Sequence, residues 1–349
     1  MSPLDALAGY GLAGAAHLAP TGWGAHLDEV VGDGLAGLLV AAHDAGDVAL
    51  TEAERDQLAE RLAQEAQLAV RLEAELLRLR PVLDRHGAVV LKGPALAHGL
   101  GIDPATRPFS DLDLLVAPRS IDRVLGELAR LGYERPRPDP SPRFASLVAK
   151  ATAVAHPTGL LVDLHRTVTL GAAGERIDVD EVLAGRIEVT AGDVAVPAPA
   201  WSTHLVVVAL HAALGDGLRR PRSIRDVALV AHHADLDARG ALALARRWQV
   251  HQPVAAALDA VQRRLGVELP EVLADAAEGA ASWAPPRQPR LDQLSSGASL
   301  RARRALARSM VAPTPTYLRW AYGPRPLPAL YWRRWRDLGR TTTLEGVGA

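Results

Sequence analysis

The segment RPFSDLDLLV, residues 107–116, places two aspartates one residue apart in a stretch that otherwise resembles a buried strand. Successive side chains of a strand point to opposite faces, so Asp111 and Asp113 share one face while Leu112 and Leu114 take the other. Aspartate is a poor strand former and adjacent like charges repel, so the pair requires a compensating cation or open water. The pair is therefore the first candidate for a metal site.

A third carboxylate follows in LVDLHR, residues 161–166, where Asp163 and His165 share one strand face. If this strand lies beside the first, three carboxylates converge. Such a donor set suits Mg²⁺, which prefers oxygen ligands and keeps positions for water and phosphates. Two such ions can hold the attacking and leaving oxygens of a phosphoryl transfer. The three aspartates indicate phosphate chemistry, and the alternative is a set of solvated surface acids.

The segment LKGPAL, residues 91–96, offers a complementary place for phosphates. A strand that runs into Gly93 and then into a helix lets the backbone approach a polyphosphate, with amides facing the negative charge. Lys92 or Arg107 could add a positive charge. Lysine is rare in this chain, because 37 of the 39 basic residues are arginine and the two lysines are Lys92 and Lys150. A lysine at a given position is therefore more informative about function than an arginine.

Together these segments resemble the polymerase-β-like nucleotidyltransferase superfamily, in particular its bacterial branch of uncharacterised nucleotidyltransferases. The resemblance rests on LKGPALAHGL, RPFSDLDLLV and LVDLH, and continues more loosely through LHAAL and RSIRDVALV to about residue 235. It implies a mixed-sheet catalytic domain that transfers a nucleoside monophosphate from an NTP, such as ATP, with two Mg²⁺ ions. That activity is of the EC 2.7.7 type.

The resemblance also implies roles for individual residues. Asp111 and Asp113 would bind metal, Asp163 would be the third carboxylate, and Gly93 would be the glycine of the phosphate loop. Nucleotide contacts are expected from Lys92, Gly93, Arg107, Ser110 and His165. The superfamily usually has a serine after the glycine, whereas this chain has Pro94, which removes a hydroxyl and an amide donor from the phosphate site.

The composition is that of an ordinary globular protein. The 349 residues suffice for about two domains, and 48% are hydrophobic, enough to build cores. Cysteine is absent, which excludes disulfides, thiolate nucleophiles and cysteine-based metal sites. Because no leader or apolar segment of membrane-spanning length is recognised, we expect a cytoplasmic protein.

The sequence pattern predicts an α/β (α+β) fold. Its centre is a mixed-sheet nucleotidyltransferase domain, as the resemblance implies, with helices before it and a helical domain after it. Four segments are expected. The segments are an N-terminal helical part (1–80), the catalytic domain (81–200), a helical domain (201–284) and an Arg-, Pro- and Trp-rich tail of partial regularity (285–349). Residues 1–50 read as short helices. A long helix starts at Thr51, whose capping box is completed by Glu54, and is expected to end or kink near Pro81 and to close at Gly87.

The catalytic segment is predicted to run strand, helix, strand, helix and then two hairpins. Its strands are expected at residues 88–93, 111–116, 145–156, 160–168, 186–191 and 194–199. Ser120 is the expected N-cap of the second helix. Gly192 and Asp193 form the turn of the last hairpin. Farther on, Arg225 and Asp226 are expected to tie two helices together.

The net charge of −1 is unevenly distributed. Residues 286–340 hold 12 Arg against two Asp, a local excess of +10 that leaves −11 for the rest, so this tail is a candidate surface for an anionic partner. Three of the seven Trp and three of the five Tyr lie between Tyr317 and Trp335. Such a segment binds nucleic acid or a membrane surface, or packs its aromatics on its own domain.

The sequence therefore predicts an Mg²⁺-dependent nucleotidyltransferase and leaves the acceptor open among small molecules, proteins and RNA. One alternative is a toxin-like enzyme that adds nucleotides to RNA ends. The other is a non-catalytic nucleotide- or protein-binding module on a degenerate nucleotidyltransferase fold. The preferred NTP, the oligomeric state and the effect of Pro94 on catalysis stay open.

Overall fold

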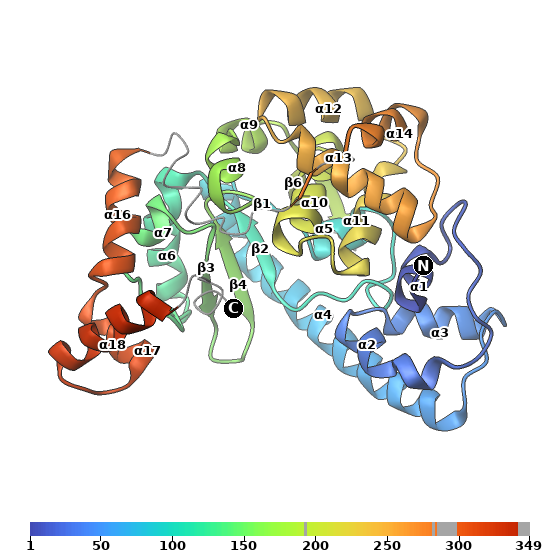
Figure 1. Ribbon diagram of the computed structural model, residues 1–349, viewed down its shortest axis with the longest axis horizontal. Coiled ribbons are helices and arrows are strands. Elements are labelled where there is room, and N and C mark those ends of the chain that lie inside the picture. The colour runs from blue at the N-terminus through green and yellow to red at the C-terminus, as the bar shows by residue number, and fades with distance from the viewer. Residues whose placement is uncertain (192–193, 281–282, 285–298, 341–349) are drawn as a thin grey trace. The chain divides into compact units, whose positions relative to one another are not determined.

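The computed structural model describes residues 1–191, 194–280, 283–284 and 299–340. A four-stranded sheet of order β1-β2-β4-β3 and a two-stranded sheet, β5-β6, are combined with helices (Figure 1), which confirms the predicted α+β class. The chain divides into two compact units, residues 1–113 with 180–285 and residues 114–179 with 286–349. The division falls inside β2 (Leu112–Leu115), after Asp113.

The N-terminal part is helical, as predicted. Helices α1 (Pro3–Gly9), α2 (Leu27–Gly32) and α3 (Ala36–Asp44) precede the long α4 (Glu52–His86). The predicted capping box is present, because the Thr51 hydroxyl accepts from the Glu54 amide and the Glu54 carboxylate accepts from the Thr51 amide. Gly87, at φ 59°, closes the helix by donating its amide to the carbonyls of Leu83 and Asp84.

Pro81 lies inside α4 and does not end it, whereas the closure predicted at Gly87 is confirmed and the alternative of a kink at Pro81 stays a prediction. A proline inside a helix lacks an amide donor and its ring clashes with the preceding turn, at a cost of about 3 kcal/mol. Leu79, Val82 and Leu83 are all buried around it. The packing of this turn outweighs the local cost, and the helix continues to His86.

The strands that carry the candidate residues are short. β1 (Val89–Val90) leads into Gly93 and α5 (Pro94–Gly99), and β2 begins at Leu112, so Asp111 lies just before it. β3 (Ala151–Ala155) pairs antiparallel with β4 (Leu161–His165). In this register Ala153 faces Asp163 and Ala151 faces His165, which confirms the first predicted hairpin.

One local prediction in this region is wrong and another is confirmed in position only. Residues 144–147 form the helix α7 (Phe144–Leu147) instead of the first half of a strand, since Phe144 and Leu147 pack against a cluster that includes Leu306 of α16 (Leu300–Val311). Ser120 holds the predicted N-cap position of α6 (Ile121–Arg130), but its hydroxyl makes no capping hydrogen bond. Its backbone is already helical because it ends a 3₁₀ turn, Pro118–Ser120.

The second predicted hairpin is formed by β5 (Arg186–Ala191) and β6 (Val194–Pro199), and its turn at Gly192 and Asp193 lies outside the described residues. The predicted helices follow as α10 (Trp201–Leu210), α11 (Pro221–Ala231), α12 (Ala238–Arg247) and α13 (His251–Ala260). Short helices α8 (Gly171–Arg176), α9 (Val179–Ala184) and α14 (Glu271–Ala277) complete this part.

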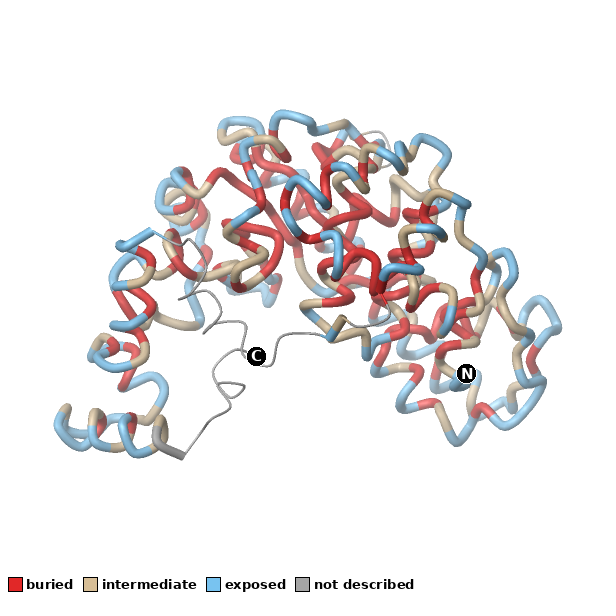
Figure 2. Tube along the Cα trace, turned by 45° about the horizontal axis from the view of Figure 1, so that its top comes forward, coloured by how far each residue is buried: buried red, intermediate tan, exposed pale blue. Residues whose placement is uncertain are grey.

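The described part of the tail is largely helical. α16 is followed by α17 (Pro315–Tyr322) and α18 (Leu327–Arg340), whereas residues 285–298 and 341–349 of the predicted tail lie outside the described residues. Buried residues, red in Figure 2, gather in the interior, and exposed residues lie on loops and outer turns. Among the described helices, none combines the length and apolar character needed to cross a membrane.

His204 of α10 contacts the backbone of the segment that precedes Gly93. Its Nε2 lies 2.8 Å from the carbonyl oxygen of Leu91, and because a carbonyl can only accept, Nε2 carries the proton. Burial lowers the pKa of His204 to about 4. The ring is therefore neutral at pH 7 and ties α10 to the end of β1.

We predict that His204 makes the protein less stable as the pH falls from 6.5 to 4. The unfolded chain takes up a proton near the ordinary pKa of 6.5, whereas the folded chain resists protonation down to about 4. The free energy of unfolding should then fall by up to about 1.4 kcal/mol per pH unit in this window. Urea unfolding of wild type and His204→Gln, whose amide can still donate to Leu91, measures the difference. The exposed His251→Gln is the control, and equal pH slopes in wild type and His204→Gln would contradict the prediction.

Candidate active site

Asp113 is a buried acid in β2, with 7% of its surface exposed. The Leu91 amide donates to the Asp113 carbonyl at 2.9 Å, and this backbone bond sets Lys92 beside Asp113. Lys92 Nζ lies 3.1 Å from Asp113 Oδ2. Lys92 thus supplies the cation that a buried carboxylate requires. A phosphate contact from the same lysine stays a prediction.

Asp163 and His165 lie on β4, the neighbour of β2 in the sheet. One ligand atom from each of Asp113, Asp163 and His165 can be chosen so that all three lie within 4.8 Å of one another. This group could hold a metal ion. Its two carboxylates suit Mg²⁺, and its imidazole is a donor that transition-metal ions favour.

His165 is oriented by its own strand end. The ring is 1% exposed, and Nδ1 lies 3.3 Å from the carbonyl oxygen of Thr167. Since a carbonyl only accepts, this contact requires the proton on Nδ1 and leaves a lone pair on Nε2. Metal-binding histidines are commonly fixed in this way. The sequence predicted a nucleotide contact for His165, and the structure adds metal ligation as a second possible role.

Asp111 and Ser110 directly precede β2. The three-residue group does not include Asp111, which is half-buried before the start of β2, and Ser110 beside it is exposed. The shared strand face deduced for Asp111 and Asp113 requires regular strand geometry at Asp111, and β2 begins one residue later. Metal binding by Asp111 and a nucleotide contact from Ser110 stay predictions.

Gly93 adopts a backbone conformation that suits glycine. Its φ is 56° and its ψ is −120°, and a Cβ built there would approach the Asp111 carbonyl oxygen to 3.5 Å, an ordinary contact. Conformation rather than lack of space therefore requires glycine at this position. Pro94 follows at the first position of α5 and is buried.

Arg107 is held in a buried ion pair with Asp226 of α11. Its Nε and Nη2 donate to the two carboxylate oxygens at 2.7 and 2.8 Å, and its Nη1 donates to the Gly93 carbonyl at 3.2 Å. Burial by itself would raise the pKa of Asp226, but the charge and hydrogen bonds of Arg107 outweigh it and lower the pKa. Arg107 thus fixes the loop at Gly93, and its predicted nucleotide contact stays a prediction.

Arg225, the neighbour of Asp226, also has a structural contact. Its guanidinium donates to the carbonyls of Ala8 and Tyr10, at and after the end of α1, at 2.7 and 2.8 Å. Arg225 therefore joins α11 to the end of α1, as expected of a contact between two helices. Asp226 instead binds Arg107, which lies in a loop.

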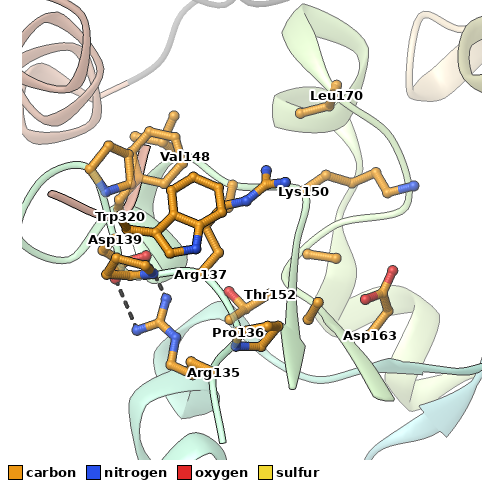
Figure 3. A pocket seen from close by; sticks show the side chains of 16 residues that line it. Arg135, Pro136, Arg137, Asp139, Val148, Lys150, Thr152, Asp163, Leu170 and Trp320 are labelled. Carbon is orange, nitrogen blue, oxygen red and sulfur yellow. Dashed lines mark hydrogen bonds and ion pairs between the residues drawn. The ribbon is translucent and has the colours of Figure 1, made fainter. Parts of the chain in front are cut away.

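Asp163 also lines a cavity of about 460 Å³ together with Arg137, Lys150 and Trp320 (Figure 3). Sequence reasoning singled out Lys150 for its rarity alone and did not connect Trp320 with Asp163. The rarity of lysine was the available signal, since one lysine lies beside Asp113 and the other lines the cavity at Asp163.

We predict that Lys92→Met lowers the free energy of unfolding of the metal-free protein by about 1–3 kcal/mol, because Asp113 loses a charged partner in a buried site. A divalent cation should recover part of this loss, since it supplies positive charge to the same carboxylate. Urea unfolding in EDTA and in Mg²⁺ measures both effects. Lys150→Met is the matched control and should cost less, and an unchanged stability of Lys92→Met in EDTA would argue against the ion pair.

If His165 is a ligand, the site should bind Co²⁺ more tightly than Mg²⁺, because an imidazole favours the transition-metal ion. His165→Ala should then weaken Co²⁺ binding by about tenfold or more and Mg²⁺ binding by less. Isothermal titration calorimetry with each ion checks this, with His156→Ala in the β3–β4 turn as the control. Equal losses for the two ions would show that His165 does not ligate.

Comparison with known proteins gives one family match. A family model described as "Uncharacterised nucleotidyltransferase" matches residues 19–266, which include Lys92, Gly93, Asp113, Asp163 and His165. None of the curated proteins compared with the chain matches it. Because the family model spans more than half of the 349 residues, the chain belongs to this family of uncharacterised nucleotidyltransferases.

Proposed function

We propose that the chain is an Mg²⁺-dependent enzyme that transfers a nucleoside monophosphate from an NTP, with ATP as the first candidate, to an acceptor hydroxyl. The observation that carries the proposal is the grouping of Asp113, Asp163 and His165 in a member of a nucleotidyltransferase family. Two carboxylates this close favour a divalent cation between them.

Asp111, Asp113 and Asp163 are the proposed metal ligands, with two ions as in the superfamily that the sequence resembles. Bound ions would polarise the phosphoryl oxygens and stabilise the charge that develops on the leaving group. Lys92 and Ser110 contact the phosphates in this proposal. Arg107 acts as a positioning residue, because its guanidinium holds the Gly93 carbonyl and the Asp226 carboxylate.

Asp163 is the proposed general base. Its carboxylate accepts the proton of the acceptor hydroxyl while the acceptor oxygen forms a bond to the α-phosphorus. The bond from the α-phosphorus to the oxygen that bridges to the β-phosphorus breaks, and pyrophosphate leaves. His165, held through Nδ1 by Thr167, orients the nucleotide or shares in metal binding.

We expect Asp113→Asn to remove Mg²⁺-dependent NTP binding and transfer together, because it takes one charge from the metal group. Asp163→Ala should keep most Mg·NTP binding and slow single-turnover transfer by roughly 10²- to 10⁴-fold, the range of a lost general base. Calorimetry with ATP and pyrophosphate release in a single turnover measure the two effects. Asp122→Asn, at an exposed position of α6, is the matched control.

Normal turnover by Asp163→Ala would exclude the assigned base. ATP binding that is unchanged by EDTA would instead favour the non-catalytic binding module, because that module has no need of a metal ion for affinity.

A further inference from the structure

The cavity beside Asp163 lies within the unit formed by residues 114–179 and 286–349 (Figure 3). Its volume is about 460 Å³, and its lining comes from residues 135–140, from β3 and from α17 among others. β3 contributes Ala151, Thr152 and Ala153, and Ala153 is the residue paired with Asp163. The two small alanine side chains thus leave the space beside the Asp163 carboxylate open.

Trp320 of α17 forms a wall of this cavity. Its side chain is 47% exposed, the guanidinium carbon of Arg137 lies 5.1 Å from the ring centroid, and the Tyr317 ring lies at 5.7 Å. Both neighbours contact the indole. An accessible aromatic ring beside a cavity is typical of a surface that packs against a ligand. Trp320 lies beyond residue 266, where the family match ends.

The charges of the lining favour an anion. Arg135 and Asp139 form a two-point ion pair at 2.5 and 3.2 Å and neutralise each other. In all, the lining holds three cations, Arg135, Arg137 and Lys150, and two anions, Asp139 and Asp163. Figure 3 places Lys150 and Asp163 at one side of the cavity, away from Trp320. A metal ion at Asp163 would make the lining still more positive.

We propose that this cavity is the acceptor site and that the acceptor is a small hydroxyl compound bearing a phosphate or carboxylate group. This inference rests on the proposed function, because it places the reacting hydroxyl at Asp163. The anionic group would lie near Lys150 or Arg137, and the remainder of the molecule would pack against Trp320. Ala153 and Trp320 are then specificity-determining residues.

The size and charge of the cavity favour a small molecule over the end of an RNA. The volume of 460 Å³ falls in the usual range for small-molecule sites, roughly 300–1,000 Å³. Binding to RNA generally neutralises several phosphates along a strand. Arg137 and Lys150 are few for that purpose, and three prolines of the lining, Pro136, Pro138 and Pro140, have no amide to donate to a phosphate.

The test fills the cavity without touching a charged group. Ala153→Leu places a larger side chain beside Asp163, at a position that is exposed in β3. Ala155→Leu is the matched control, because it lies two residues along the same strand, on the same face, and outside the lining. Trp320→Ala removes the aromatic wall and serves as the second variant.

The probes are glycerol 3-phosphate and 3-phosphoglycerate, with glycerol as the neutral comparison and a short RNA with a free 3′ hydroxyl. Each is titrated into the full chain with Mg²⁺ and a non-hydrolysable ATP analogue, and each is offered as acceptor with α-labelled ATP. We expect at least one anionic probe to bind and to accept label, and glycerol to be much weaker. Ala153→Leu and Trp320→Ala should raise the Kd of that probe about tenfold or more, and Ala155→Leu should leave it unchanged.

Mg·ATP binding, measured on the same samples, separates this inference from the proposed function. Variants that keep both Mg·ATP and probe affinity would overturn the acceptor site and leave the function standing. Binding of neither anionic probe, or label transfer to the RNA alone, would overturn it as well. A wild-type chain that fails to bind Mg·ATP would refute the proposed function itself, and the acceptor site with it.

Discussion

A carboxylate buried inside a strand requires a compensating cation, and this constraint governs the centre of the protein. Asp113 is 7% exposed in β2, and Lys92 lies 3.1 Å from it. The same carboxylate belongs to the group with Asp163 and His165 that could hold a metal ion. Lysine and metal would therefore act on one acid, so metal affinity and fold stability are linked at this position.

Two further buried contacts fix the loop on which the proposed phosphate chemistry depends. Arg107 joins Asp226 of α11 to the Gly93 carbonyl, and neutral His204 of α10 donates to the Leu91 carbonyl. Because unpaired buried polar groups are costly, these contacts hold the backbone on both sides of Lys92. The helical segment thus contributes to the site by positioning the loop.

The residues proposed for the nucleotide and for the acceptor come from different parts of the chain. Lys92, Gly93 and Asp113 lie in residues 1–113, whereas Lys150, Asp163 and Trp320 belong to residues 114–179 and 286–349. Trp320 lies outside the span that the family model matches. The proposed acceptor wall thus includes a residue that the family match does not cover, as is common where function varies on one fold.

The sequence by itself determined the features that depend on neighbouring residues. The start of α4 at Thr51, its end at Gly87, both hairpins and the spacing of Asp113, Asp163 and His165 follow from capping chemistry, turns and strand alternation. The continuation of α4 through Pro81 and the helix α7 were decided by packing, which outweighed the local preference. The pairing of Arg107 with Asp226, of Lys92 with Asp113, and the approach of Trp320 to the cavity at Asp163 were likewise decided by tertiary structure. These contacts join side chains with no local pattern between them, and they arise because a buried charge must find a partner that the folded chain alone brings within reach.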